Sequence, residues 1–194
     1  MIQTPSYPFD RMLEWETQQP RPDRPNLEIV AAAYRSLTDT EDSRLELPAQ
    51  LPTCVRLDFE SLNRFESVDR QYGRWGVTFI NTIAIQPSNP SFPPHSGQMV
   101  VMGAPKNGSI ELTFQYPIRF LSGFVTSSRG TTLTAFDLDD RILDQDELAE
   151  SNLNDSNSSI SANSELIVRA DNIYRVLFYA LQGQLVVDDI SFGF

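Results

Sequence analysis

From Thr53 to Phe194 the chain is a series of short segments in which apolar and polar residues alternate, with turn residues between them. The clearest is Ile110–Tyr116, whose alternation would place apolar side chains on one face and polar ones on the other. Helical periodicity is missing between these segments. This pattern predicts an all-β fold, an antiparallel β-sandwich of the jelly-roll type. We expect strands near residues 53–60, 76–85, 97–102, 109–116, 118–126, 131–138, 164–169, 173–180 and 184–192.

Residues 1–52 have a different composition and hold seven of the thirteen prolines. Proline fixes φ and lacks an N–H donor, so this part predicts an extended N-terminal arm without sheet. Within it, residues 26–37 predict one short amphipathic helix. Asn26 is a suitable N-cap, and one stripe carries the apolar residues Leu27, Val30, Tyr34 and Leu37. Because such a helix is not stable alone, its stripe would dock on the protein's own sandwich or on a partner protein.

Charge and cysteine content exclude several classes of protein. The net charge of -11 disfavours nucleic-acid binding, which needs a basic surface. The single cysteine, Cys54, permits no intrachain disulfide and is expected to be a small buried side chain. No apolar run approaches the roughly 20 residues of a membrane span, and the N-terminus has no signal-peptide pattern. This favours an intracellular location or an unconventional route of export.

The predicted last strand contains two adjacent carboxylates, Asp188 and Asp189. Neighbouring strand residues point to opposite faces, so one of the two should point inward and need a partner. The segment 55–60, with Arg56 and Glu60, is the best place to find it. The inward carboxylate could accept backbone N–H bonds, pair with Arg56, or contribute to a metal site.

Several short motifs resemble bacterial jelly-roll domains of the galactose-binding-like and carbohydrate-binding-module kind. They are Leu57–Glu60, Tyr72–Phe79, Thr134–Asp137 and Val187–Gly193, and the resemblance covers about residues 53–194. In many such domains a structural calcium ion joins the first and last strands. Carried over to this chain, the resemblance implies calcium ligands at Glu60 and at Asp188 or Asp189.

The aromatic residues allow two interpretations. Tyr72 and Trp75, with Tyr116, Phe120 and Tyr179, could form a platform on which a sugar ring stacks, as the resemblance implies. Alternatively, each could be a core residue, because sandwiches bury alternate aromatics.

Catalytic motifs are missing from the sequence. The only histidine, His95, lies among prolines, and no G-x-S-x-G nucleophile motif occurs. The long loop 86–97, rich in proline and serine, could carry a binding site or simply connect the two sheets. The acidic segment 137–150 has Ile142 where a calcium-binding EF-hand loop needs glycine, and predicts a solvated hairpin.

The sequence is compatible with two functions. The first is a non-catalytic interaction or structural subunit, anchored in a larger assembly by its N-terminal arm. The second is a carbohydrate-binding module, with or without structural calcium, whose basis is the resemblance.

Overall fold

The computed structural model describes residues 29–32, 52–103, 108–154 and 159–194 and confirms the all-β prediction. A short 3-10 helix, η1 (Gly73–Trp75), accompanies the strands. The strands are β1 (Ile29–Ala32), β2 (Cys54–Leu57), β3 (Ser67–Val68), β4 (Val77–Ile80), β5 (Thr82–Ile85), β6 (Val100–Gly103), β7 (Ser109–Ser127), β8 (Thr131–Phe136), β9 (Ile142–Leu148), β10 (Ser164–Tyr179) and β11 (Leu185–Gly193).

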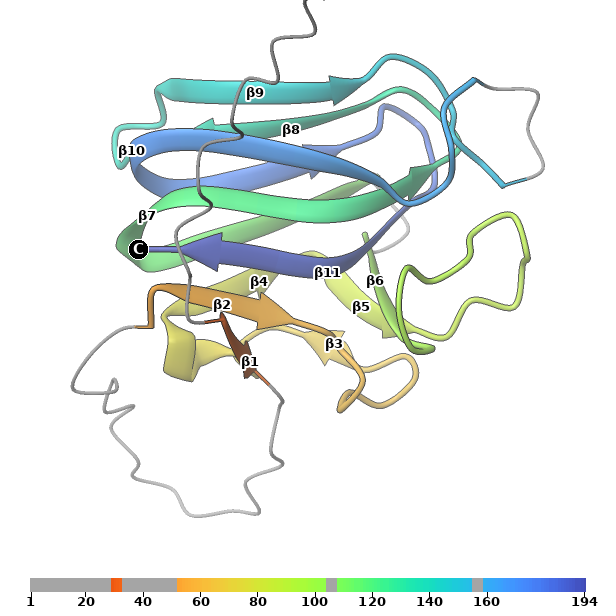
Figure 1. Ribbon diagram of the computed structural model, residues 1–194, viewed down its shortest axis with the longest axis horizontal. Coiled ribbons are helices and arrows are strands. Elements are labelled where there is room, and N and C mark those ends of the chain that lie inside the picture. Colours follow the sequence, from red (N-terminus) through yellow and green to blue (C-terminus); the bar gives the residue numbers. More distant parts are fainter. Residues whose placement is uncertain (1–28, 33–51, 104–107, 155–158) are drawn as a thin grey trace, which may run out of the picture.

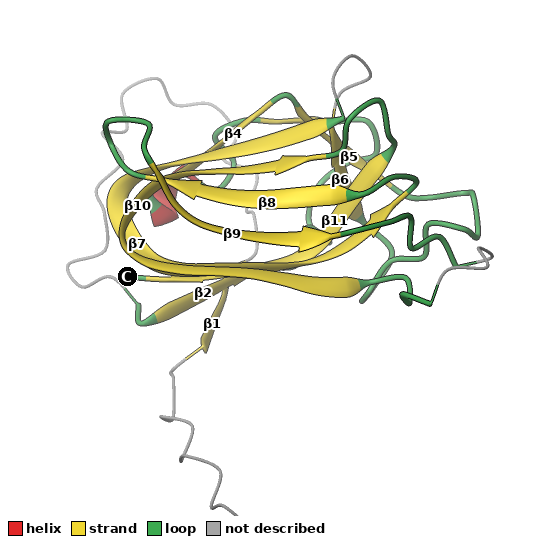
Figure 2. Ribbon diagram, turned by 90° about the horizontal axis from the view of Figure 1, so that it is seen from above, coloured by secondary structure: helices red, strands yellow, loops and turns green. Residues whose placement is uncertain are grey.

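The strands form a β-sandwich whose two layers share β7 and β10 (Figures 1 and 2). The first half of β7 pairs with β4 and with the second half of β10, which continues to β8 and β9. The second half of β7 pairs with β11 and with the first half of β10. Beyond β11 the second layer continues through β6 and β5 to β3. All pairings of the described strands are antiparallel except that of β1 with β2.

Two of the longest strands were each expected as two separate strands. Residues 109–127 form the single strand β7, although Pro117 lies within it. The ladder with β10 shifts register here, passing from Ile118 opposite Ile173 to Thr113 opposite Arg175. Pro117 lies in the interval where the β7–β10 pairing is interrupted, so the N–H that proline lacks is not needed for a hydrogen bond to β10. The bend of β7 at this point lets one strand serve both layers.

The predicted helix at residues 26–37 is wrong over its described part. Ile29–Ala32 is the strand β1, which pairs in parallel with β2 and places Val30 opposite Val55. The expectation that the arm contains no sheet is therefore wrong here too. The free edge of β2 offers backbone N–H and C=O groups, whereas an isolated short helix has little stability of its own. Leu27, Tyr34 and Leu37 lie outside the described residues.

The acidic segment forms the predicted hairpin, and its second arm is a strand that was not among those expected. Residues 142–148 form the edge strand β9, and two of its carboxylates reach β10. Asp144 Oδ2 accepts the N–H of Arg169 at 2.7 Å, and Asp146 Oδ2 accepts that of Ile167 at 2.9 Å. These side chains satisfy β10 backbone groups at an edge of the sandwich, which leaves fewer free donors for another strand.

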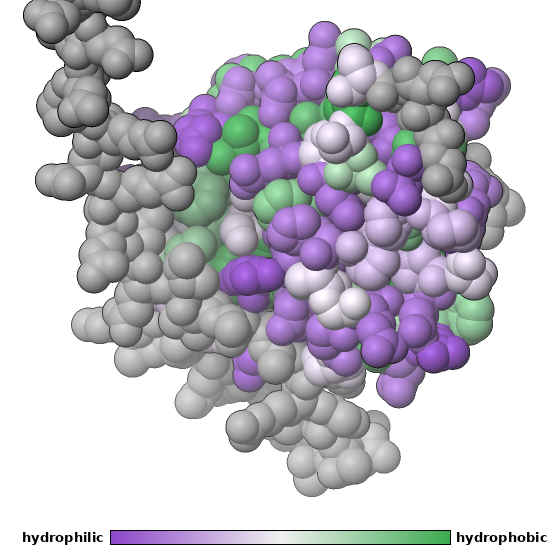
Figure 3. All heavy atoms as spheres, turned by 45° about the vertical axis from the view of Figure 1, so that its right-hand side comes forward, coloured by the Kyte–Doolittle hydropathy of each residue, from purple (hydrophilic) through white to green (hydrophobic). Residues whose placement is uncertain are grey.

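The main core lies between the two layers and contains Val55, Leu112, Phe178 and Phe192, each fully buried. On the face viewed in Figure 3, hydrophilic side chains predominate and hydrophobic ones form small separate patches. Among the described residues, no helix has the length and apolar character needed to span a membrane.

Candidate functional site

Asp188 and Asp189 lie where β11 changes its partners. One edge of β11 pairs with β6 at residues 186–187 and with β2 from Ile190 onward, while the register with β7 shifts between Asp188 and Ser191. Asp189 has a φ of 47°, a left-handed conformation that aspartate adopts more readily than most residues. The strand alternation fails here, and the two aspartates are only 1% and 2% exposed. A buried carboxylate with partners was predicted here, but only one; both aspartates are buried and both have partners, so the restriction to one is wrong.

Asp188 binds backbone N–H groups. Its Oδ2 accepts the N–H of His95 at 2.8 Å and that of Ser96 at 3.0 Å, and its Oδ1 accepts the N–H of Asp189 at 2.7 Å. Burial raises the pKa of the Asp188 carboxyl to about 6, the charge of Asp189 adds to this, and the N–H donors oppose it. Backbone acceptance was one of the alternatives drawn from the sequence.

Asp189 binds side chains. Its Oδ1 accepts from Arg56 Nε at 3.1 Å, and its Oδ2 lies 2.8 Å from Arg56 Nη2 and 2.6 Å from His95 Nδ1. Burial alone would raise the pKa of Asp189, but the hydrogen bonds from His95 and Arg56 outweigh it and lower that pKa below its usual value. The His95 ring also stacks on Phe124, with ring centroids 3.5 Å apart.

Glu60 holds the next part of the same loop. Its Oε1 accepts the N–H of Gln98 at 2.9 Å and that of Met99 at 2.8 Å. Gly97, with a φ of 56°, lies against this carboxylate, and a Cβ at this position would overlap it. All three carboxylates predicted to bind calcium therefore hold residues 95–99. We call residues 86–99 the clamped loop.

These contacts bear on the calcium prediction. The carboxylates of Glu60, Asp188 and Asp189 face N–H donors and a guanidinium group, and such donors cannot coordinate a cation. Among the residues that the structure describes, no group of three or more His, Cys, Asp or Glu side chains is arranged to hold a metal ion. The described residues do not fit the ion that the resemblance implied, and calcium binding stays a prediction for a calcium titration to test.

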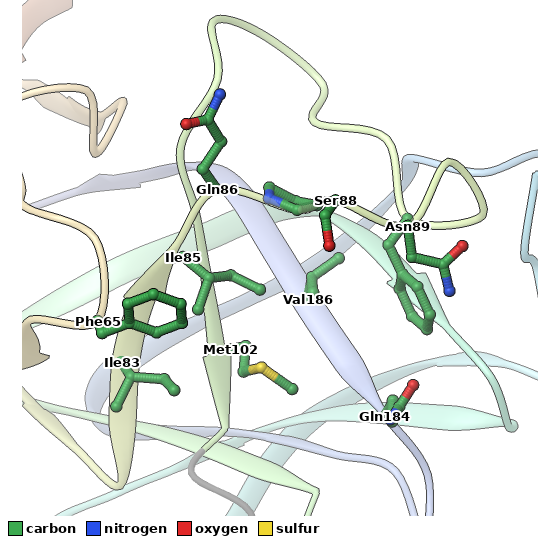
Figure 4. A pocket seen from close by; sticks show the side chains of 11 residues that line it. Phe65, Ile83, Ile85, Gln86, Ser88, Asn89, Met102, Gln184 and Val186 are labelled. Atoms are coloured by element: carbon green, nitrogen blue, oxygen red, sulfur yellow. The ribbon is translucent and has the colours of Figure 1, made fainter.

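The first part of the clamped loop forms a wall of a groove of about 350 Å³ (Figure 4). This volume is near the lower end of the range for small-molecule sites. The groove lies on the face of β5, β6 and β11 that points away from the main core. Its lining residues are Phe65, Ile83, Ile85, Gln86, Pro87, Ser88, Asn89, Phe92, Met102, Gln184 and Val186.

The floor of the groove is aliphatic because strand alternation places three apolar residues in one row. Ile83 lies opposite Met102 on the neighbouring strand, and Met102 lies opposite Val186 on the next. The residues that follow or precede them, such as Val101 and Val187, point into the main core. Both faces of β6 and β11 are therefore apolar here, and the outer face forms a second cluster with the buried Phe92.

Phe65 lies at one end of the groove, and Asn89 and Gln184 lie at the other (Figure 4). The Phe65 side chain is 79% exposed, and its backbone has a φ of 63°. Its N–H donates to the carbonyl of Ala84 at 2.7 Å, which holds the residue beside β5. An exposed aromatic residue in a left-handed conformation is rare, and such strain is concentrated at functional sites.

The residues predicted to stack on a sugar lie elsewhere. Tyr72 is fully buried between Phe59 and Phe79, with ring centroids 5.9 Å from each, so the prediction for Tyr72 is wrong and its core alternative is correct. Trp75 is half-buried against the main core, with the Arg74 guanidinium 4.9 Å from its ring centroid. Neither residue lines the groove.

Sequence reasoning missed most of the groove. The loop 86–97 was recognised as a possible binding loop, and its residues 86–89 and Phe92 do line the groove. Phe65 was missed because it lies in a short irregular segment with no periodic pattern. The outward positions of β5 and β6 were missed because an apolar residue in a predicted strand is first assigned to the core.

Comparisons with known proteins give fold-level matches alone. No protein-family model matches the chain. No curated protein matches it either. Among solved structures, the family 29 carbohydrate-binding module CBM29_1 of Piromyces equi is 10% identical, with a TM-score of 0.36, over 60% of this chain and 79% of that one. A DUF4465 family protein of Bacteroides caccae is 12% identical, with a TM-score of 0.35, over 60% and 72% of the two chains.

A third structure contains the CBM22-1 and GH10 modules of the Clostridium thermocellum xylanase 10B. It is 6% identical, with a TM-score of 0.36, over 61% of this chain and 26% of that one. Over about 60% of its length, the chain is similar in fold to these three structures.

Proposed function

We propose that this chain is a non-catalytic carbohydrate-binding module whose ligand lies in the groove beside the clamped loop. The observation that carries the proposal is Phe65, an aromatic side chain that is 79% exposed at the groove's end and held there with a φ of 63°. The face of an aromatic ring packs against the C–H groups of a sugar ring. Phe59 has a similar φ of 61° but is fully buried in the main core, whereas Phe65 keeps the same conformation with its ring exposed, so burial does not account for it.

The remaining groove residues suit a neutral sugar. Among the described residues that line it, there is no Asp, Glu, Lys, Arg or His, so a charged ligand would lose hydration without gaining an opposite charge. Asn89 and Gln184 supply carboxamide groups, which can donate to and accept from hydroxyls. A lining of this composition also offers no general acid or base, which favours binding over hydrolysis.

The other function considered from the sequence, an interaction subunit anchored by its arm, stays a prediction. Apart from Pro52, the described part of the arm is Ile29–Ala32, which pairs with the chain's own β2. The structure thus uses this segment within the chain. Three of the four residues predicted to bind a partner lie outside the described residues.

Affinity electrophoresis and isothermal titration calorimetry against neutral polysaccharides and oligosaccharides test the proposal. Phe65→Ala should weaken binding at least tenfold, as expected for removal of an aromatic anchor. Phe65→Tyr should retain binding. Leu138→Ala is the matched control, because Leu138 is 76% exposed but lies on the β8–β9 hairpin. Binding that is equally strong in the Phe65→Ala variant would contradict the proposed site.

A further inference from the structure

The floor of the groove is poorly suited to an unsubstituted sugar. The floor is an aliphatic row that crosses three strands, with Ile85 beside it (Figure 4). Ile83 and Met102 are half-buried and give the row its accessible surface, and Val186 is buried in a cluster with Phe92 behind it. A hydroxyl pressed onto this surface would lose its water partners and find no replacement. A methyl group at the same place would instead remove apolar surface from water.

Polar partners lie at the rim of the groove. Gln86 Nε2 donates to Gln98 Oε1 at 2.9 Å, so this carboxamide is partly used. Asn89 Oδ1 accepts the N–H of Ser91 at 3.0 Å, which leaves the Asn89 amide nitrogen directed elsewhere. The Gln184 carboxamide has no hydrogen-bond partner among the described residues. Ring hydroxyls would therefore be satisfied at the end marked by Asn89 and Gln184, and not over the floor.

We propose that the ligand is a neutral sugar that carries a methyl-bearing substituent, either an acetyl group or a 6-deoxy methyl group, which packs on the row formed by Ile83, Met102 and Val186. This inference rests on the proposed function and names the class of sugar that the same groove takes. Phe65 packs against the sugar ring at one end, and the carboxamides at the other end bind its hydroxyls.

Matched pairs of sugars test the inference in calorimetric titrations. N,N′,N″-triacetylchitotriose and cellotriose share a β-1,4 backbone and differ in the acetamido group, and L-fucose and L-galactose differ in the 6-hydroxyl. At least one methyl-bearing member should bind ten times or more tightly than its partner. The two pairs distinguish an acetyl from a deoxy methyl. Saturation-transfer difference NMR should then show the strongest transfer at the substituent's methyl protons.

The outcomes separate the inference from the proposed function. If the unsubstituted member of both pairs binds as tightly as the methyl-bearing member, and binding is lost in Phe65→Ala, the inference is wrong while the proposed function stands. If no member of either pair binds and a panel of neutral polysaccharides does not bind either, both are wrong.

A pair of variants tests the role of the floor. Met102→Gln keeps the length of the side chain and adds a carboxamide, so it should reduce the preference for the methyl-bearing sugar at least fivefold. Met102→Leu keeps an apolar floor and should preserve the preference. The ratio of the two affinities is compared within each variant, so a general loss of stability does not mimic the result. An unchanged ratio in Met102→Gln would overturn the inference.

Discussion

His95 Nδ1 lies 2.6 Å from Asp189 Oδ2, and this contact joins the clamped loop to an irregular point of β11. The same carboxylate binds Arg56 of β2, and its neighbour Asp188 binds the backbone of His95 and Ser96. The loop that walls the groove is thus fixed by buried charged groups on the adjoining strands. This arrangement has measurable consequences for stability.

Asp189→Asn should lower the free energy of unfolding by about 1.5–3 kcal/mol, because hydrogen bonds to a charged group are lost at a buried site. Asparagine tolerates the positive φ of this position, so the backbone is not an additional source of strain. Urea denaturation measures the change. Asp171→Asn is the control, since the Arg119–Asp171 pair is 3.9 Å apart with both side chains mostly exposed, and less than about 0.5 kcal/mol is expected. If Asp189→Asn and Asp171→Asn lower the free energy of unfolding by the same amount, the buried Asp189 carboxylate does not stabilise the fold as stated.

Asp188 should make the protein less stable as the pH rises through about 6. Burial raises the pKa of this carboxyl to about 6, whereas the pKa of an aspartate in an unfolded chain is about 3.9. The folded protein retains a proton that the unfolded chain releases. This contribution to stability is complete below a pH of about 3.9 and is lost as the pH rises through the folded-state pKa. It amounts to at most about 3 kcal/mol.

The measurement is the difference in pH dependence between the wild type and Asp188→Asn, followed by urea denaturation from about pH 4.5 to 8. The carboxamide that this substitution introduces does not titrate, so the wild type should lose more stability than the variant over this range. The charged and titratable groups that face Asp188 are the same in both proteins, so their contributions to the pH dependence largely cancel in the difference. These groups are Asp189, His95 and Arg56. Parallel curves would show that Asp188 does not titrate in this range.

Gly97→Ala should destabilise the protein by more than about 1 kcal/mol, because its φ of 56° is strained for alanine and the new Cβ overlaps the Glu60 carboxylate. Gly76→Ala separates the two causes. Gly76 has a φ of 72°, but a Cβ there would meet its nearest neighbours at an ordinary 3.6 Å. Thermal denaturation of both variants should show the larger loss for Gly97→Ala. If Gly76→Ala costs as much, the Glu60 contact does not constrain the loop.

Phe65→Asn should raise the free energy of unfolding by about 1 kcal/mol, since asparagine adopts a positive φ more readily than phenylalanine. Little buried surface is lost, because the side chain is mostly exposed. Phe65→Ala is the matched control: it also removes the ring but keeps a residue that disfavours this φ, so it should gain less. A protein that is stabilised by Phe65→Asn and no longer binds sugar would show that the strain serves binding.

The strand pattern predicted the fold class because alternation over segments such as Ile110–Tyr116 is specified locally. The layers were less predictable. A bend within β7 depends on which strands pair with each half, and the sequence around Pro117 was interpreted as a break. Residues 29–32 were assigned to a helix, and their strand depends on the free edge of β2, which is a tertiary contact.

The candidate site was predicted only in part. The sequence singled out Asp188, Asp189 and Glu60, and it considered Arg56 as a partner, but their common contact with residues 95–99 depends on the path of a loop distant in sequence. The exposure of Phe65 and the row of Ile83 and Met102 depend on register. No local pattern distinguishes an apolar residue on an outer face from one in the core.

The most direct test of the central claim is an NMR titration of the isotope-labelled protein with a neutral oligosaccharide that binds in the screen. The groove predicts shifts of the Ile83 and Met102 methyl groups and of the amides near Gln184, with loss of these shifts in Phe65→Ala. Shifts confined to the other layer, for example at Thr113, Phe136 and Arg175, would place the ligand on the opposite side of the sandwich and contradict the account.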